Sequence, residues 1–396
     1  MIAGMKFHSW IVISAVSWAL GFNAAAEVRT WKNAEGVALQ AEITDATETH
    51  VTLKLENGQS HKLPLEKLSA EDQQFAAKWF EAREAAAEKE LGENWDEPWP
   101  KLVKTDVSPD IETVKEDEAA GEFVYRSPTF EFHSDVQLSG SVVKRFSVLF
   151  EATAELCRKL PISLQKPHVK REKRLKVELF GSKANYITNG GPAESAGVYM
   201  SGRDVVMVPL TSLGVERVGD RYIMDHDKEN KTLTHEIVHQ LTDLQYYAPG
   251  ARGWFSEGLA EYVGLSPYRM GSYSPSGVMN PMKEYVTAYG KDGNGGRALG
   301  EEIALPSLQV WMNQSYANFL ANAQVNYGSA ALVFYYFAHM DGDKEGSNLK
   351  AFCLALREGK RGEEAIEALR AGRTYEEMEA ELTKAWRGRG VKFTFN

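Results

Sequence analysis

The stretch KTLTHEIVHQLTDL, residues 231–244, places two histidines four positions apart, with a glutamate directly after the first. On a helix, residues i and i+4 lie on the same face, so the imidazoles of His235 and His239 can reach one cation. Glu236 lies one residue round the helix from that face, close enough to reach a water on the metal. This H-E-x-x-H pattern is typical of zinc hydrolases. A catalytic zinc site needs two further parts, a third protein ligand and an open position.

A second helical stretch, GWFSEGLAEYVG, offers the third ligand. One known solution, a third histidine, would require Gly at 242 and His at 245, but the chain has Thr242 and Gln245. The other common solution is a glutamate from the next helix, and Glu257 lies 257 − 239 = 18 residues after His239. The turn-forming stretch APGARG between them gives the chain room to reverse, so that a second helix can lie beside the first.

These motifs resemble those of the gluzincins, zinc metallopeptidases of the peptidase-MA type. HEIVHQ followed by WFSEGLAEY matches the W-x-x-E-G-x-A-E-Y pattern of secreted bacterial members. The resemblance implies an α+β, zincin-like metallopeptidase domain over 122–396, with strands and a helix first and a helical C-terminal half. Within it, GVYMSGRDVVMVPL would be the strand before the active-site helix. The site residues that it implies are the zinc (Zn2+) ligands His235, His239 and Glu257 and the general base Glu236.

Two further residues are candidates for supporting roles. Glu261 shares a helix face with Glu257, and ligand histidines usually donate their second ring N–H to a carboxylate, so Glu261 is either that partner or a solvent-facing acid. Tyr327 begins a helix 327 − 257 = 70 residues after Glu257, as the catalytic tyrosine does in the aminopeptidase branch. Its phenol would donate to the oxyanion that forms during hydrolysis, or the ring is a core aromatic. His339, at a helix end, is expected near the surface.

The chain departs from the aminopeptidase branch in one respect. That branch carries a G-x-M-E-N strand whose glutamate binds the free amino terminus of the substrate, and nothing in this chain matches it. We therefore expect a zinc-dependent endopeptidase that acts on a peptide or protein substrate by a metal-activated water. The alternative is an envelope protein-interaction module in which the zincin domain is structural or inactive.

Residues 27–76 predict a small β unit, because two alternating apolar runs are joined by an Asn-Gly turn in ENGQ. The stretch resembles the Sla-homology SH3-like barrel, which implies an interaction role with a protein or envelope ligand that it does not name; a packing domain without a partner is the alternative. The matching residues are Arg29, Trp31, Gly36, Ala41, Val51, Leu53, Gly58, Pro64, Leu65, Leu68, Ser69 and Asp72. A helix that opens at Ser69 and an acidic, Pro-containing linker are expected to follow, over 77–121.

The pattern of residues 1–26 predicts a signal peptide. A weakly basic start precedes an apolar run at 10–22, and Ala24-Ala25-Ala26 offers a cleavage site. No later run reaches the roughly 20 apolar residues that a membrane span requires. We therefore expect a secreted or periplasmic protein, cleaved after Ala26, with no membrane span after cleavage.

Composition is that of a globular protein, with 43% hydrophobic residues over 396 positions. The net charge of −10 argues against a nucleic-acid partner. Cys157 and Cys353 are the only cysteines, and they would either form a disulfide after export or be two buried small hydrophobes. From 122 onward strand patterns come first, and helical periodicity dominates the end of the chain, which is the pattern of an α+β domain. The helical stretches are LPSLQVWM, YGSAALVFYYFAHM, NLKAFCLALREG, GEEAIEALRAG and TYEEMEAELTKAW.

Overall fold

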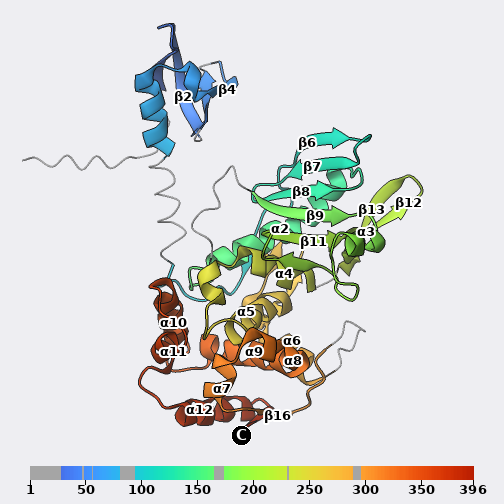
Figure 1. Cartoon of the computed structure of the whole chain (residues 1–396), viewed down its shortest axis with the longest axis vertical. Helices are drawn as coiled ribbons and strands as arrows, with labels where there is room; N and C mark the ends of the chain where they lie inside the picture. The colour runs from blue at the N-terminus through green and yellow to red at the C-terminus, as the bar shows by residue number, and fades with distance from the viewer. Residues whose placement is uncertain are drawn as a thin grey trace, which may run out of the picture. The chain divides into compact units, whose positions relative to one another are not determined.

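The structure is a computed structural model, and the chain in it divides into two compact units, Met1–Ala86 and Ala87–Asn396 (Figure 1). The described residues are 28–46, 49–55, 57–80, 94–164, 174–229, 232–288 and 296–396. The expected signal peptide, residues 1–26, lies outside them. Among the helices that are described, none combines the length and the apolar character required to cross a bilayer.

The first unit contains a four-stranded antiparallel sheet in the order β1-β2-β3-β4. Its strands are β1 Val28–Lys32, β2 Ala38–Ala46, β3 His50–Leu55 and β4 Ser60–Pro64. The expected Asn-Gly turn joins β3 to β4, and Gly58 takes a φ of 83° that a side chain would strain. Trp31, Val51 and Leu53 form the core, and residues 70–80 are helical. In the described residues β1 and β4 remain the edges of an open sheet, so the expected barrel is not closed.

A six-stranded mixed sheet, in the order β10-β11-β9-β8-β7-β6, forms one side of the second unit. Strands β8, β9 and β11 run parallel, while β10 at one edge is antiparallel to β11. Three smaller sheets complete the unit. The strands are β5 Val103–Lys104, β6 Glu112–Asp117, β7 Glu122–Arg126, β8 Phe130–Ser134, β9 Leu175–Phe180, β10 Val198–Met200, β11 Val205–Pro209, β12 Leu213–Val218, β13 Arg221–Glu229, β14 Tyr268–Arg269, β15 Ser272–Tyr273, β16 Glu302–Leu305 and β17 Lys392–Phe395.

Helices cover this sheet and then dominate the C-terminal half, which confirms the α+β class (Figure 1). Helix α4 packs against β10, β11 and α2, and α5 packs against α4 and α9. One continuous apolar core joins these layers. The helices are α2 Gly140–Lys159, α3 Lys183–Thr188, α4 Thr232–Leu241, α5 Trp254–Leu265, α6 Met279–Thr287, α7 Leu308–Asn313, α8 Tyr316–Ala321, α9 Ala323–His339, α10 Ser347–Arg357, α11 Glu363–Arg370 and α12 Tyr375–Arg387.

The acidic linker expected at the end of the 77–121 segment, residues 92–121, is described from residue 94 onward, and there it belongs to the second unit. The Trp99 indole N–H donates to the Glu345 carbonyl at 3.1 Å, and the ring packs edge-on against Tyr262. Strand β5 pairs with β15, and β6 pairs with β7. A few large side chains such as Trp99 and two short strands attach this stretch to the unit. The stretch has no apolar periodicity, so its sequence does not indicate that it packs against a core.

Two other expectations, on the strand before α4 and on the cysteines, can be compared with the structure of the second unit. The stretch expected as one strand before the active-site helix forms the hairpin β10–β11, and a second hairpin, β12–β13, intervenes before α4. Cys157 and Cys353 are both buried and free, so they are not joined in a disulfide. Burial raises the pKa of both thiols, as expected of cysteines that act as small core residues.

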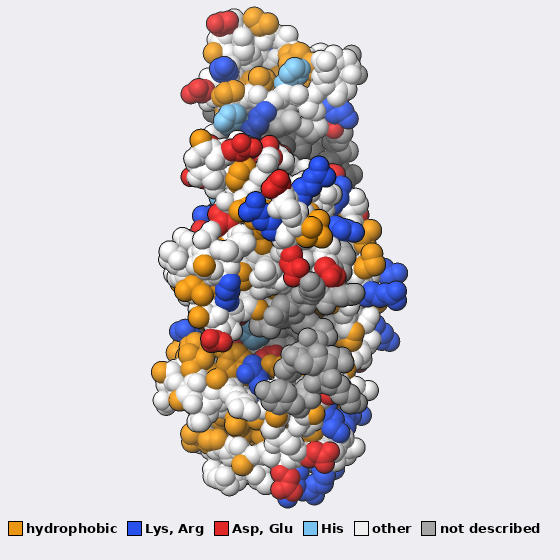
Figure 2. All heavy atoms as spheres, turned by 90° about the vertical axis from the view of Figure 1, so that its right-hand side faces the viewer, with side chains coloured by type: hydrophobic (Ala, Val, Ile, Leu, Met, Phe, Trp, Pro, Cys, Tyr) orange, Lys and Arg blue, Asp and Glu red, His pale blue; other side chains and the backbone are white. Residues whose placement is uncertain are grey.

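Charged side chains of both signs are interspersed on the face shown in Figure 2. No block of basic residues gathers on the described part of that face. A nucleic-acid interface requires a concentrated positive patch. That the protein has no nucleic-acid partner stays a prediction.

The close approach of α5 and α9 depends on Gly258, which lies next to Glu257 in the sequence. A Cβ atom at this position would lie 2.4 Å from the Ala330 carbonyl oxygen and 2.9 Å from the Phe334 Cβ. Backbone cannot yield as a flexible side chain can, so any side chain at 258 must push the two helices apart. The glycine therefore fixes the depth at which Glu257 is held.

We expect Gly258→Ala to destabilise the protein by about 1–3 kcal/mol, because it overpacks the contact between the helices. The matched control is Gly140→Ala at the start of α2, where the added methyl group meets open space. Chemical denaturation followed by circular dichroism measures both variants. Equal free energies of unfolding for the two would show that the approach of α5 to α9 is not constrained by Gly258.

Candidate metal centre

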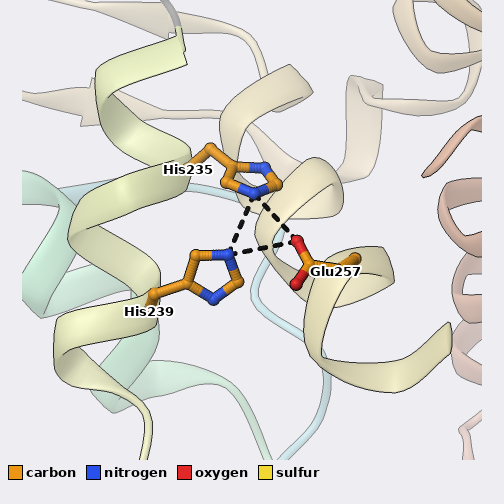
Figure 3. A group of neighbouring side chains, drawn as sticks. All are labelled: His235, His239 and Glu257. Carbon is orange, nitrogen blue, oxygen red and sulfur yellow. Dashed lines mark hydrogen bonds and ion pairs between the residues drawn. The ribbon is translucent and has the colours of Figure 1, made fainter. Parts of the chain in front are cut away.

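The structure brings together the three side chains expected as metal ligands (Figure 3). The Nε2 atoms of His235 and His239 lie 3.0 Å apart, and Oε2 of Glu257 lies 3.1 and 3.2 Å from them. The two histidines project from successive turns of α4, and the glutamate projects from α5 towards them. All three residues are buried, and Glu257 is only 2% exposed.

The geometry of this triad fits a metal ion better than a set of hydrogen bonds. A tetrahedral ion with bonds of about 2.0–2.1 Å holds its ligand atoms about 3.3–3.4 Å apart, close to the separations found. Two imidazole nitrogens that face each other and the same carboxylate oxygen cannot all be satisfied by one proton. In the described part of the chain, this is the group of His, Cys, Asp and Glu side chains that could hold a metal ion.

The charges of His235 and Glu257 depend strongly on each other. Burial alone would lower the pKa of His235, but its hydrogen bond to Glu257 and the negative charges of Glu261, Glu257 and Glu236 outweigh burial and raise the pKa to about 9. Burial would raise the pKa of Glu257, but the two histidines hold it well below its usual range. The site therefore attracts positive charge, either as a proton or as a metal ion.

Glu236 is outside the ligand triad, on the side of α4 that faces the edge strand β10. Its Oε2 accepts a hydrogen bond from the Tyr199 backbone N–H at 2.8 Å, and the carboxylate is half-buried. This bond is made at the edge of β10 that does not pair with β11. The carboxylate of Glu236 therefore follows His235 in the sequence without being one of the three side chains that form the triad.

Tyr327 lies beside the triad. Its ring stacks on that of His235, with centroids 5.9 Å apart, and it is half-buried rather than enclosed in the core. Burial and the nearby Glu257 raise the pKa of the phenol, so it stays protonated and can donate a hydrogen bond. Its hydroxyl also lies next to that of Tyr316. The phenol therefore borders the site, while its role in a reaction stays a prediction.

Glu261 does not contact a ligand histidine in the described residues. Its Oε1 accepts hydrogen bonds from the Tyr285 hydroxyl and from Arg297 Nη2, both at 2.9 Å. The Arg297 guanidinium also lies over the Tyr327 ring, 4.8 Å from its centroid. The carboxylate is buried rather than facing solvent, and it acts on the triad through its charge.

His339 does not reach the triad. Its Nε2 bonds the Tyr262 hydroxyl at 3.0 Å, and its ring packs on Trp99 at 4.9 Å. Burial lowers the pKa of His339 to about 4, so the ring is neutral at physiological pH. His339 is the last residue of α9 and stays partly exposed, as expected of a helix-end histidine near the surface, although Trp99 packs on its ring.

Two residues in direct contact with the ligands had no sequence signal. Tyr247 ends the short 3-10 helix η3, Leu244–Tyr247, and its hydroxyl lies 3.1 Å from His239 Nδ1. Tyr316 lies 59 residues after Glu257 and donates to its Oε1 at 2.9 Å. Neither position belongs to a spaced motif, because both are placed by tertiary packing. Only the adjacency of Tyr247 to the H-E-x-x-H helix could have suggested it.

No protein-family model matches the chain, and a search of curated proteins returned no match. What the metal centre does is therefore inferred from its own geometry and chemistry.

We expect metal binding to release about one proton per ion at pH 7.5, because His235 has a pKa near 9 and must lose its proton to become a ligand. Metal affinity should rise with pH up to about pH 9. In the metal-free protein the raised pKa has the opposite effect: the charged ring stabilises the fold below pH 6.5, and this contribution is lost as the pH rises through about 9.

Calorimetric titration with zinc in two buffers of different ionisation enthalpy measures the released protons. His133→Gln is the matched control, because His133 bonds Glu131 and does not contact the triad. It should leave the proton count unchanged. Zinc binding without proton release at pH 7.5 would mean that His235 is neutral before the metal arrives, contrary to the charge balance described above.

Proposed function

We propose that the protein is an exported zinc-dependent peptidase of the gluzincin type, and that it acts as an endopeptidase. The observation that carries the proposal is the convergence of His235, His239 and Glu257 with Glu236 beside them but outside the ligand set. A purely structural metal site has no use for such a carboxylate. This combination of two imidazoles, one carboxylate ligand and an adjacent base is suited to hydrolysis by a metal-activated water.

Zinc is the metal that best fits the donors. Two imidazole nitrogens and one carboxylate oxygen form a ligand set of catalytic zinc sites, whereas magnesium and calcium prefer oxygen ligands alone. Structural zinc sites usually have four protein ligands, but in the described residues the group has three. A position is therefore left for water or substrate.

Each residue of the site then has a defined task. Zinc held by the triad would polarise a water and the substrate carbonyl. Glu236 would accept the proton of the attacking water and pass it to the leaving amine. Tyr327, held protonated beside His235, would donate a hydrogen bond to the carbonyl oxygen as negative charge develops on it.

The edge strand β10 favours an extended peptide as the substrate. The outer side of β10 pairs with no other strand in the described sheet, and the Tyr199 backbone N–H on that side is bonded to Glu236, so an incoming peptide strand would exchange with that bond. Extended peptides bind such edges by adding a strand. A peptide that lies along β10 would pass the base and the triad, and it needs no free terminus to do so.

The second candidate function is an envelope protein-interaction module, with an SH3-like first unit that binds a partner and an inactive second unit. One observation favours it. The first unit carries a cavity of about 690 Å³, lined in part by Trp31, Leu53, Leu63 and the exposed Val37 and Leu39. A protein or envelope ligand could bind there whether or not the second unit is an enzyme, so a test of catalysis separates the two candidates.

We expect Glu236→Gln to keep its zinc and to lose hydrolysis by at least about a hundredfold. The amide oxygen can still accept the Tyr199 N–H, but it cannot take the proton of water. Cleavage of a quenched peptide library, with zinc content measured on the same samples, tests the proposal. The matched control is Glu194→Gln, an exposed glutamate in the loop before β10, which should retain full activity.

Two outcomes would contradict the role of Glu236. Loss of zinc from Glu236→Gln would make this residue part of the metal site rather than the base. Full activity in the variant would mean that another group accepts the proton. If the wild-type protein holds zinc and cleaves no peptide, the interaction module becomes the better proposal.

We expect Tyr327→Phe to lower kcat by about a hundredfold with little change in KM, because one oxyanion donor is removed while the ring still packs on His235. Tyr335→Phe on the same helix is the control, since Tyr335 packs on His339 and Trp386 instead. Steady-state kinetics and zinc content are measured for both. An unchanged kcat in Tyr327→Phe would make Tyr327 a packing residue.

A further inference from the structure

The hydroxyl of Tyr247 makes two contacts with the same residue, His239. It lies 3.0 Å from the His239 backbone carbonyl oxygen and 3.1 Å from the ring Nδ1. A carbonyl oxygen can only accept, so the single proton of the phenol is donated to it. The phenol oxygen must then accept from Nδ1, which therefore carries the ring's proton. This pair of contacts sets the tautomer of His239.

A ring protonated at Nδ1 has its lone pair at Nε2, the atom that faces His235 and Glu257. The contact with Tyr247 therefore prepares His239 as a metal ligand before any metal arrives. The anchor is rigid, because the carbonyl belongs to the last turns of α4 and Tyr247 follows on the same stretch of chain in η3. The His239 ring cannot turn over without breaking its hydrogen bond to the Tyr247 hydroxyl.

A second phenol acts on Glu257 in a comparable way. Tyr316 donates to Oε1 at 2.9 Å, while Oε2 faces the two histidines. Each carboxylate oxygen thus has its own partner, and only one of them is directed to the position of the metal. Tyr316 is itself held in place, because its ring stacks on Phe319 and the Arg252 guanidinium lies over it at 4.4 Å.

We propose that Tyr247 and Tyr316 are positioning residues for the metal, with Tyr247 fixing the tautomer of His239 and Tyr316 restricting Glu257 to a single metal-binding oxygen. Carboxylates usually take this part around ligand histidines. Glu261, on the same helix as Glu257, is bonded to Tyr285 and Arg297 instead. Neutral phenols orient the ligands without adding negative charge, which leaves the metal more able to polarise its open position.

The inference rests on the proposed metal site, and it is tested without a measurement of hydrolysis. Zinc affinity is determined by competition with a chelator for the wild-type protein, Tyr247→Phe and Tyr246→Phe. Tyr246 is the matched control, because its buried hydroxyl donates to the Ile162 and Ser163 carbonyls and does not contact the triad. We expect Tyr247→Phe to weaken zinc binding by about 10- to 100-fold, and Tyr246→Phe to change it by less than about twofold.

Two spectroscopic measurements report the positioning directly. In the zinc-loaded protein, nitrogen-15 spectra should show a protected Nδ1–H for His239, and Tyr247→Phe should lose that protection. In the cobalt-substituted protein, Tyr316→Phe should reduce the intensity of the visible bands, because Glu257 is then free to bind through both oxygens and raise the coordination number. Tyr335→Phe should change neither spectrum.

The proposal is overturned if Tyr247→Phe binds zinc as the wild-type protein does, or if Tyr246→Phe weakens binding equally, since a general loss of stability would then explain both. Unchanged cobalt bands in Tyr316→Phe would remove the role of Tyr316. These results are independent of catalysis. A protein that binds zinc through oriented ligands and cleaves no peptide would contradict the proposed function and leave this inference standing.

Discussion

The structure depends on one constraint, which is that two helices hold two imidazoles and a carboxylate within about 3 Å of one another away from water. Burying a carboxylate is unfavourable unless a positive charge compensates it. Glu257 is almost fully buried, and its charge is balanced by the histidines of α4. The site is thus preorganised for a cation. The packing of α4, α5 and α9 keeps the Glu257 carboxylate buried, which would be unfavourable without a compensating positive charge.

The rest of the second unit positions this arrangement from both sides. Gly258 lets α5 approach α9 closely, and the same approach brings Tyr327 of α9 against His235. On the opposite side, the sheet edge at β10 meets α4 through the hydrogen bond of Glu236. The metal centre therefore lies where the helical half of the unit meets the sheet. At this junction the buried ligands lie beside the edge of β10 that pairs with no other described strand.

Much of this site was accessible from the sequence, because it is encoded by local spacing. The i, i+4 histidines and a glutamate on the following helix require only helical geometry and a turn, and the structure confirms that they converge. The helices of the C-terminal half were predicted for the same reason. Tyr316 and the partners of Glu261 come from distant segments and depend on tertiary packing, which no local pattern records. The segment around Trp99 was assigned to a linker because single anchors, not periodic apolar residues, attach it to the core.

The most direct test of the metal centre is X-ray diffraction from crystals grown with zinc, with anomalous data collected on both sides of the zinc absorption edge. We expect one strong anomalous peak about 2 Å from Nε2 of His235, Nε2 of His239 and Oε2 of Glu257. The Glu236 carboxylate should remain outside the bonding distance of the ion. A peak elsewhere on the chain, or an ion bound by the histidines with Glu257 turned away, would contradict the metal centre and the hydrolytic function proposed for it.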